Sequence, residues 1–433
     1  MMKAMSKKIG VVSLGCDKNR VDTENMLYYL KDGDFEIVDD FNDAEIIFVN
    51  TCAFIESARA EAIDTIFEMS DYKKTGKCKQ LIVTGCLPEK YREQLEDGIP
   101  EVDAFLGVRE YEKIAKIVGL RDDDSETTDK RIITTPQHYA YLRIADGCDN
   151  HCTFCTIPSI RGKYKSLPMD KVLEQAADLE KLGVKEVIIV AQDVTSYGKD
   201  IYGKPNLVEL LKKLSEFNFE WIRLMYCYPE LVTDELIEEI STNPKIVKYI
   251  DIPLQHVDDG VLKLMGRRSR KAQIESVINK LRSKCPDISI RTTFMVAFPS
   301  ETKEQFENLC NFAKEYRLDH VGLFAYSKEY DTPSAKIKGQ VPSYTKLERL
   351  DLLGDILEMN AREANEKLVG KTVRVLYEDI DYNKNMFVGR TQYNAPEVDS
   401  VVYFRGDFVD VGEFYDVKIT DVAGYDLIGE LVK

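Results

Sequence analysis

The sequence has little of several features that mark other protein classes. Of its 433 residues only four are histidines, which argues against a metal centre built mainly from histidine. No run of about eighteen apolar residues occurs, so we expect no membrane-spanning helix. The first residues are basic but lack a long apolar stretch and a small-residue cleavage site. This start argues against a secretory signal and predicts a cytoplasmic protein.

Positive charge is also scarce. The chain has 59 Lys and Arg residues against 75 Asp and Glu residues, a formal net charge of −16. Binding to phosphates needs cationic side chains that displace counterions, so this balance argues against general nucleic-acid affinity and favours a basic partner. Hydrophobic residues make up 44% of the chain, which is typical of a folded globular protein, and the length predicts two or three domains.

Alternating β-rich and helical runs predict an α/β protein of several domains. Residues 7–120 contain four such strand-like runs, which predict an N-terminal parallel βα sheet domain. The charged, aperiodic stretch within 121–135 is typical of a linker. Residues 136–366 contain six further strand-like runs with helical segments between them, which predict a partial (β/α) barrel. Short β-like runs in 367–433 predict a small antiparallel barrel or sandwich.

Three of the ten cysteines form a C-x-x-x-C-x-x-C motif, and we call them the loop cysteines: Cys148, Cys152 and Cys155. The number of cysteines in a long chain without a signal favours metal or redox chemistry over a disulfide framework. Three closely spaced thiolates can hold three irons of a four-iron cluster. The fourth iron would then be open to a substrate, as in catalytic metal sites. The competing interpretation is a structural zinc site completed by His151.

Three other cysteines, the strand-end cysteines, each follow a β-rich run: Cys16 after VVSLG, Cys52 after IIFVNT and Cys86 after LIVTG. They are separated by about one βα unit each. Because parallel strands place their carboxyl ends on one edge of the sheet, topology alone would bring these thiols together. We therefore predict a second iron–sulfur cluster there, again with an open iron. Three unrelated core thiols are the alternative.

These residues resemble a known family. The segment 148–155, with the aromatic Phe154 before its last cysteine, is similar to the signature of radical S-adenosylmethionine (SAM) enzymes. Together with the strand-end cysteines and the β-rich tail, it makes the whole chain resemble the radical SAM methylthiotransferases. The strings VSLGCDKNRVDTENML (12–27) and ADGCDNHCTFCTIPSIRGKYKS (145–166) resemble the branch that acts on a ribosomal protein. GRTQYNAPEVDSVVYF (389–404) resembles a TRAM domain, which is a β-barrel.

The resemblance implies a function and its cofactors. It implies two [4Fe-4S] clusters, one on the loop cysteines that binds SAM and an auxiliary one on the strand-end cysteines that delivers sulfur. A second SAM would methylate that sulfur, so two SAM molecules would be used per turnover. The implied product is a methylthio group on the β-carbon of an aspartate of small-subunit ribosomal protein twelve, either free or on the ribosome. An electron donor is a further implied partner.

Candidate SAM contacts lie mainly at or near the ends of the predicted barrel strands. They are Phe154, Gln192, Asp193, Arg223 and Arg291. Polar groups at strand ends would hold the ribose hydroxyls, and an arginine can bind a carboxylate through two hydrogen bonds. The competing interpretation is an ordinary polar residue or ion pair. Arg161, just after the loop cysteines, is either a SAM contact or an anchor of that loop. Ala297 and Ser300 stand where the family commonly has glycine.

Two other functions compete with this interpretation. A tRNA adenosine methylthiotransferase would use the same six cysteines, so the cysteines do not discriminate. The charge of the C-terminal region does discriminate between the two substrates. Residues 367–433 contain 8 basic and 12 acidic residues, a net of −4, which favours a basic protein over tRNA. A non-catalytic, zinc-stabilised adaptor is the more distant alternative, and metal content separates it from the enzyme.

Overall fold

The computed structural model describes residues 6–31, 33, 35–122, 124–125, 128–407 and 409–432. The chain forms two compact units. The first contains Met1–Thr134, Asp146–Asp149 and Cys155–Lys165, and the second contains Thr135–Ala145, Asn150–Phe154 and Ser166–Lys433. The predicted domain boundaries stay predictions. Within the predicted linker 121–135, residues 123, 126 and 127 lie outside the described residues.

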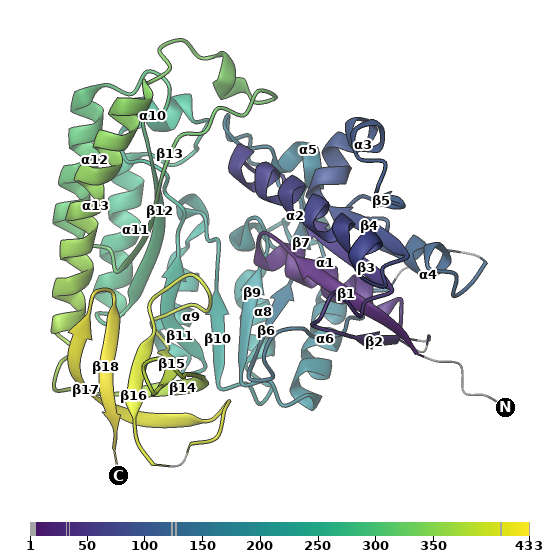
Figure 1. Cartoon of the computed structure of the whole chain (residues 1–433). Coiled ribbons are helices and arrows are strands. Elements are labelled where there is room, and N and C mark those ends of the chain that lie inside the picture. The colour runs from purple at the N-terminus through teal and green to yellow at the C-terminus, as the bar shows by residue number, and fades with distance from the viewer. Residues whose placement is uncertain are drawn as a thin grey trace. The chain divides into compact units, whose positions relative to one another are not determined.

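The first unit contains a five-stranded parallel sheet in the order β2-β1-β3-β4-β5 (Figure 1). Its strands are β1 (Lys7–Ser13), β2 (Phe35–Ile37), β3 (Ile46–Thr51), β4 (Gln80–Gly85) and β5 (Ala104–Leu106). Its helices are α1 (Asp17–Tyr28), α2 (Glu56–Thr75), α3 (Cys86–Gly98), α4 (Ile114–Ile117) and α5 (Ile157–Arg161), with a 3-10 turn η1 (Tyr111–Lys113). The predicted parallel sheet is confirmed, with β2 as an additional short edge strand.

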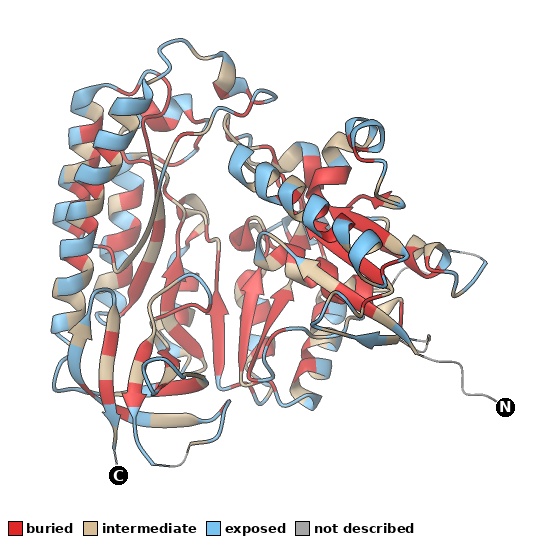
Figure 2. Cartoon of the chain, in the orientation of Figure 1, coloured by how far each residue is buried: buried red, intermediate tan, exposed pale blue. Residues whose placement is uncertain are grey.

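Alternation along β3 explains why helices cover both faces of this sheet. Ile47 and Val49 pack in one core with Ile66 of α2, and Phe48 packs in the other with Met26 of α1. Neighbouring side chains on a strand point to opposite faces, so a strand that is apolar throughout needs cover on both sides. Figure 2 shows β3 buried along its length. Each large aliphatic side chain buried here contributes about 1.5–3 kcal/mol.

The second unit contains a six-stranded parallel sheet in the order β13-β12-β11-β10-β9-β6, the predicted partial (β/α) barrel. Its strands are β6 (Tyr139–Arg143), β9 (Glu186–Val190), β10 (Trp221–Leu224), β11 (Ile246–Asp251), β12 (Ser289–Val296) and β13 (His320–Ala325). Its helices are α6 (Met169–Lys181), α7 (Lys199–Tyr202), α8 (Leu207–Leu214), α9 (Asp234–Thr242), α10 (Asp259–Leu264), α11 (Lys271–Lys284), α12 (Lys303–Tyr316) and α13 (Ser343–Glu366). Three 3-10 turns complete it: η2 (Val194–Ser196), η3 (Pro229–Leu231) and η4 (Pro333–Lys336). Two short strands, β7 (Ala145–Asp146) and β8 (Lys165–Ser166), pair separately.

The C-terminal residues form a closed five-stranded barrel in the order β14-β15-β16-β18-β17. The strands are β14 (Thr372–Asp381), β15 (Met386–Thr391), β16 (Val402–Arg405), β17 (Phe414–Ala423) and β18 (Asp426–Leu431). The predicted barrel is confirmed, although one pair, β16 with β18, is parallel and the others are antiparallel. None of the helices within the described ranges has the length and apolar character needed to span a bilayer.

Buried ion pairs join this small barrel to the amino-terminal ends of the parallel strands within the second unit. Arg390 of β15 donates to Glu186, the first residue of β9, at 2.7 Å and to Glu378 of β14 at 2.6 Å. His138 lies 3.1 Å from Glu378. Glu186 in turn accepts from Arg223 of β10 at 2.6 Å. Each buried charge therefore has an opposite charge beside it, which is the condition for burying charges at all.

The loop after β15 makes a second set of polar contacts with the same strand ends. Asp399 accepts hydrogen bonds from the Tyr249 hydroxyl at 2.8 Å and from Arg291 at 3.3 Å. The backbone carbonyl of Gln392 accepts from Arg223 at 2.9 Å. The loop thus supplies acceptors for strand side chains at the base of the partial barrel.

The Glu378 carboxylate predicts a pH dependence of stability. Burial alone would raise its pKa, but Arg390 and His138 outweigh burial and lower the pKa to about 2. A lowered pKa gives stability that is present above the unfolded value of about 4.3 and lost as the pH falls towards 2. We therefore expect Glu378→Gln to lower the urea midpoint of the metal-free protein at pH 7. The difference in urea midpoint between variant and parent should narrow steadily from pH 4.5 to pH 3. A constant difference would contradict the lowered pKa of Glu378.

Candidate functional site

The strand-end cysteines follow three adjacent strands of the first sheet. Cys16 is the residue before α1, three residues after β1 ends. Thr51 of β3 pairs with Gly85 of β4, and Cys52 and Cys86 come directly after this pair. Ser13 near the end of β1 pairs with Asn50 of β3. The register therefore delivers the three cysteines to one edge of the sheet, as the sequence predicted.

Two glycines make the close approach of these loops possible. Gly15 has a φ of +89°, and a Cβ atom there would lie 2.8 Å from Cβ of Cys52. Gly85 has a φ of +100°, and a Cβ atom there would lie 2.2 Å from the side-chain oxygen of Asn50. Any other residue would be strained at these angles and would clash with the neighbouring loop. The Gly-Cys pairs in the sequence therefore reflect how tightly the strand ends meet.

Asn19 of α1 links all three strand ends. Its amide nitrogen donates to the carbonyl of Leu14 at 3.1 Å, after β1, and to that of Thr51 at 3.0 Å, before Cys52. Its amide oxygen lies 4.0 Å from Sγ of Cys16 and 3.5 Å from Sγ of Cys86. Asn19 is completely buried. A single side chain thus lies beside two of the three cysteine sulfurs and binds the residue just before the third cysteine. Sequence reasoning did not single it out.

Burial makes two of these thiols hard to ionise. It raises the pKa of Cys52, and it raises that of Cys86 to about 12, although the nearby Arg161 opposes this rise. Buried thiols become thiolates when a metal ion replaces the proton, so metal binding here would release protons. The raised pKa values disfavour a free nucleophilic thiolate and are compatible with thiols that ionise only when they bind a metal.

The donor set fits an iron–sulfur cluster with three protein ligands. Among the residues that the structure describes, no group of three or more His, Cys, Asp or Glu side chains is arranged to hold a metal ion. Three thiols at one sheet edge are nevertheless the ligand type that such clusters take. A cation close to the thiols, Arg161, would balance the negative charge of a thiolate-ligated cluster.

The segment that carries the loop cysteines is divided between the two units. In the first unit, the Cys148 amide donates to the carbonyl of Gly162 at 3.1 Å, and Asp149 accepts from the Tyr164 amide at 3.1 Å. The Cys155 sulfur accepts from the Ile157 amide at 3.4 Å. These hydrogen bonds hold the segment as a loop.

In the second unit, Cys152 lies beside a buried arginine. Nη1 of Arg267 is 3.8 Å from Sγ of Cys152, and its guanidinium stacks on the ring of Tyr228. The neighbouring Phe154 packs edge-on against Phe298, with ring centroids 6.3 Å apart. Phe154 therefore anchors the loop in an apolar cluster that also contains Met265. Arg267 is a residue that sequence reasoning missed, because its partner lies 115 positions away.

Gln192 and Asp193 follow β9 as predicted. Asp193 accepts from Asn150 Nδ2 at 3.0 Å and caps η2 through the amide of Ser196 at 3.1 Å. Asn150 belongs to the cysteine segment, so Asp193 holds that segment to the strand end within the second unit. These contacts place both residues at the carboxyl end of the sheet, where α/β proteins bind ligands.

Arg223 and Arg291 have internal partners. Arg223 pairs with the buried Glu186, and Arg291 pairs with Asp251 at 3.1 Å as well as with Asp399. The ion-pair interpretation that the sequence left open describes these contacts. A further contact of either guanidinium with the carboxylate of SAM stays a prediction; within the described residues no hydrogen-bond partner is found for Arg223 Nη2.

Several buried polar atoms on the segments after β10 and β11 fit a polar ligand. Within the described residues no hydrogen-bond partner is found for Glu230 Oε2, Gln255 Oε1, Arg267 Nε and Ser269 Oγ. Buried polar atoms are normally paired, so such a group indicates a ligand or ordered water. SAM, with its amino, carboxylate and hydroxyl groups, matches this mixture of donors and acceptors.

The turn after β12 shows the conformation that glycine prefers. Ala297 and Ser300 have φ angles of +60° and +67°. This is the left-handed region, in which residues other than glycine are strained. Ala297 and Ser300 therefore replace glycines that are common in the family, but the backbone at both positions keeps the conformation that glycine prefers.

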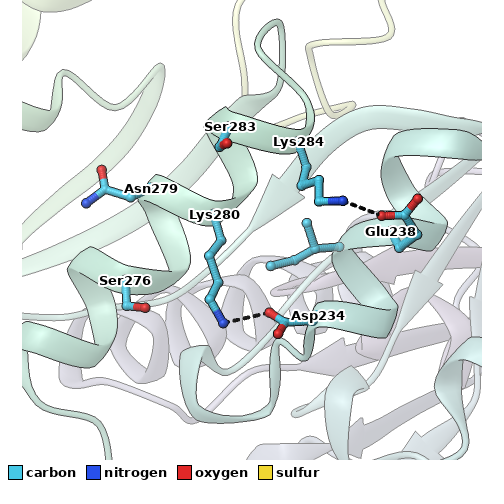
Figure 3. A pocket seen from close by; sticks show the side chains of 8 residues that line it. Asp234, Glu238, Ser276, Asn279, Lys280, Ser283 and Lys284 are labelled. Atoms are coloured by element: carbon cyan, nitrogen blue, oxygen red, sulfur yellow. Dashed lines mark hydrogen bonds and ion pairs between the residues drawn. The ribbon is translucent and has the colours of Figure 1, made fainter.

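A surface groove of the second unit is a separate feature (Figure 3). It lies between α9 and α11 and has a volume of about 660 Å³. Ion pairs cross it, from Lys280 to Asp234 at 2.6 Å and from Lys284 to Glu238 at 3.0 Å. The charges are balanced and the groove contains none of the predicted site residues, so we assign it no role in the chemistry.

The comparisons agree with this arrangement. Residues 142–313 match the Radical SAM superfamily, residues 8–107 match the Uncharacterized protein family UPF0004, and residues 369–432 match the TRAM domain. A solved structure of the radical SAM methyltransferase TsrM from Kitasatospora setae has a TM-score of 0.55 at 13% identity, over 76% of this chain and 77% of that one. This likeness concerns the fold alone. The matches define the class of radical SAM proteins with an N-terminal α/β unit and a TRAM barrel.

Full-length relatives identify the family within that class. A protein of Clostridium botulinum (strain Eklund 17B / Type B), named ribosomal protein uS12 methylthiotransferase RimO, is 48% identical over 98% of this chain and 97% of its own. A protein of the same name from Thermoanaerobacter sp. (strain X514) is 46% identical over 98% and 100%. The chain therefore belongs to the RimO family of ribosomal protein uS12 methylthiotransferases. The predicted family and its ribosomal-protein branch are confirmed.

Proposed function

We propose that this chain is a SAM-dependent methylthiotransferase that modifies an aspartate of ribosomal protein uS12 at its β-carbon. The observation that carries the proposal is the arrangement around Asn19, which lies beside the sulfurs of Cys16 and Cys86 and donates to the carbonyl just before Cys52, in a chain that aligns over nearly its whole length with enzymes of that name. Sulfur insertion needs a site from which sulfur is delivered, and a radical SAM domain alone does not supply one.

The two cysteine sets have different roles in this proposal. The loop cysteines would bind a [4Fe-4S] cluster, which supplies the electron for cleavage of SAM when it is bound. The strand-end cysteines would bind a second cluster, whose open iron position suits an added sulfur. The residues around each set hold the loops and place an arginine beside one cysteine sulfur.

SAM would bind at the carboxyl ends of the second sheet. Gln192 and Asp193 would face the ribose, and Phe154 would fix the cysteine loop against Phe298. The buried polar atoms of Glu230 and Gln255 are further candidates. An electron donor is also required, as is a second SAM per turnover for the methyl group.

The proposed partner is a basic protein, free or on the ribosome, in the cytoplasm. The net charge of −16 supports such a partner and disfavours tRNA, because phosphate binding needs clustered cations. The alternative of a tRNA adenosine methylthiotransferase is not favoured by relatives that carry the uS12 name over their full length. A zinc-stabilised adaptor is not favoured either, because the matched family is one of enzymes.

The proposal predicts a selective product. The chain, loaded anaerobically with iron and sulfide, is incubated with SAM, a reductant and either uS12 or total tRNA. We expect mass spectrometry to show one methylthio group in place of one hydrogen on an aspartate of uS12 and no methylthio adenosine in tRNA. A product on tRNA alone, or a preparation that contains zinc in place of iron and sulfide, would refute the proposed function.

A further inference from the structure

Arg161 is a completely buried arginine that comes shortly after the loop cysteines. It is the last residue of α5, six positions beyond Cys155, and its exposed fraction is 1%. The segment from Cys155 to Lys165 belongs to the first unit, as do the strand-end cysteines. Burying a guanidinium is costly unless anions and hydrogen-bond acceptors surround it, so its partners reveal why it is there.

The partners of Arg161 belong to the strand-end site and its surroundings. Nη2 donates to the Asn19 amide oxygen at 2.7 Å and to Asp22 at 2.6 Å, and it lies 3.8 Å from Sγ of Cys86. Nη1 donates to Asp146 at 3.2 Å. Asn19 is the residue that links the three strand ends. The guanidinium thus contacts the same amide oxygen as two of the cysteine sulfurs.

We propose that Arg161 is a positioning residue for the auxiliary cluster: it holds the segment after Cys155 against the strand-end cysteines and donates to the Cys86 sulfur, so that its cation favours the reduced cluster. This inference rests on the proposed function, because it requires a cluster on these cysteines. It gives the arginine that follows Cys155 a physical role at the strand-end cysteines, within the first unit.

Charge determines the direction of the expected effect. Reduction adds negative charge to a thiolate-ligated cluster, and nearby cations and N–H groups that donate to sulfur stabilise that charge. Removal of the guanidinium should therefore make the reduction potential more negative. Removal of the Asp22 carboxylate should make it more positive, because Asp22 opposes the same charge. If Arg161 only stabilised α5, removal of the guanidinium and removal of the Asp22 carboxylate would not shift the reduction potential in opposite directions.

The experiment isolates the auxiliary cluster in the full-length chain. C148A/C152A/C155A serves as the background, so that iron and sulfide bound after anaerobic loading report on the strand-end cysteines. Redox titration followed by electron paramagnetic resonance gives the midpoint potential. We expect R161Q to shift the midpoint to more negative values, D22N to shift it to more positive values and R161K to retain most of the iron and shift the midpoint less than R161Q.

Arg131 provides a matched control. It pairs at 2.8 Å with Glu24, another buried carboxylate on α1, and both side chains are almost completely buried. R131Q removes a buried charge pair of the same kind from the same unit and should leave the midpoint of the cluster unchanged. Full iron content with the parent midpoint in both R161Q and D22N would overturn the inference. So would loss of iron in both R161Q and R161K without a shift in D22N. Absence of iron from the background with Arg161 intact would instead refute the auxiliary cluster itself.

Discussion

Cys86→Ala is expected to abolish the methylthio product while cleavage of SAM continues. Cys86 is buried at the first turn of α3 and shares the Asn19 amide oxygen with Cys16. Its loss removes one of three ligands of the proposed sulfur-delivering cluster. Second-sphere partners of a metal already contribute about 10–100-fold to affinity or activity, so loss of a direct ligand should lower product formation at least 100-fold. The loop cysteines are unchanged, so 5′-deoxyadenosine should still form.

Cys78→Ala is the control for this variant. Cys78 is a buried thiol of the same unit, but it lies just before β4 and not after a strand. Its sulfur donates to the Gln80 carbonyl at 3.4 Å. Chromatographic measurement of 5′-deoxyadenosine and mass spectrometry of uS12 separate the two steps in both variants. Product at the parent rate in Cys86→Ala would remove the basis for the sulfur-delivering site.

The strand-end cysteines were predictable because their placement depends on local patterns. Each stands directly after a short β-rich run, and a parallel βα topology then fixes which edge they share. The run 80–85 coincides with β4, and the helix after it begins at Cys86 itself. No pairing of distant residues had to be guessed, since the order of β1, β3 and β4 in the sheet follows the order of the chain.

The residues that organise this site were not predictable in the same way. The string DKNRVDTE after Cys16 has the composition of an exposed helix face. In the structure Asn19, Asp22 and Glu24 are buried, because they face Arg161, Arg131 and the strand ends. Arg161 lies 139 positions from Asp22. A polar residue whose partner is that distant looks the same in sequence as a solvated one.

The same limit applies to the arginines of the second sheet. Arg291 on β12 suggested a carboxylate ligand, and the structure does place carboxylates beside it. One of them, Asp399, comes from the C-terminal barrel, 108 positions away. Arg223 meets the Gln392 carbonyl from a distance of 169 positions. The chemistry of an arginine was therefore predictable, but the identity of its anion was not.

The acidic C-terminal region also has a role that net charge did not indicate. Its excess of acid suggested a surface for a basic protein. Glu378, Glu397 and Asp399 instead accept hydrogen bonds within the second unit, from Arg390, from Tyr139 and from Tyr249. Any docking surface for uS12 on this barrel must therefore use its other, exposed acids.

Arg390→Met is expected to destabilise the second unit strongly. The Arg390 guanidinium is buried between Glu186 and Glu378, and it also donates to the Asn394 carbonyl at 2.9 Å. Removing one partner of a buried ion pair costs about 3–5 kcal/mol, because the remaining charges lose their compensation. That is a large part of the roughly 5–15 kcal/mol by which proteins are stable. Arg223 still pairs with Glu186 in this variant, so the loss of a compensating charge should affect mainly the Glu378 carboxylate.

The single tryptophan reports on this loss directly. Trp221 begins β10 and packs edge-on against Phe414 of the C-terminal barrel, with ring centroids 4.7 Å apart. Its fluorescence therefore follows the contact that Arg390 helps to hold. In urea we expect the transition of Arg390→Met at a clearly lower concentration than that of Arg405→Met, an exposed arginine on β16 whose removal should change stability by less than about 0.5 kcal/mol. Equal midpoints would contradict this prediction and would mean that the barrel is held mainly by its apolar contacts rather than by its buried charges.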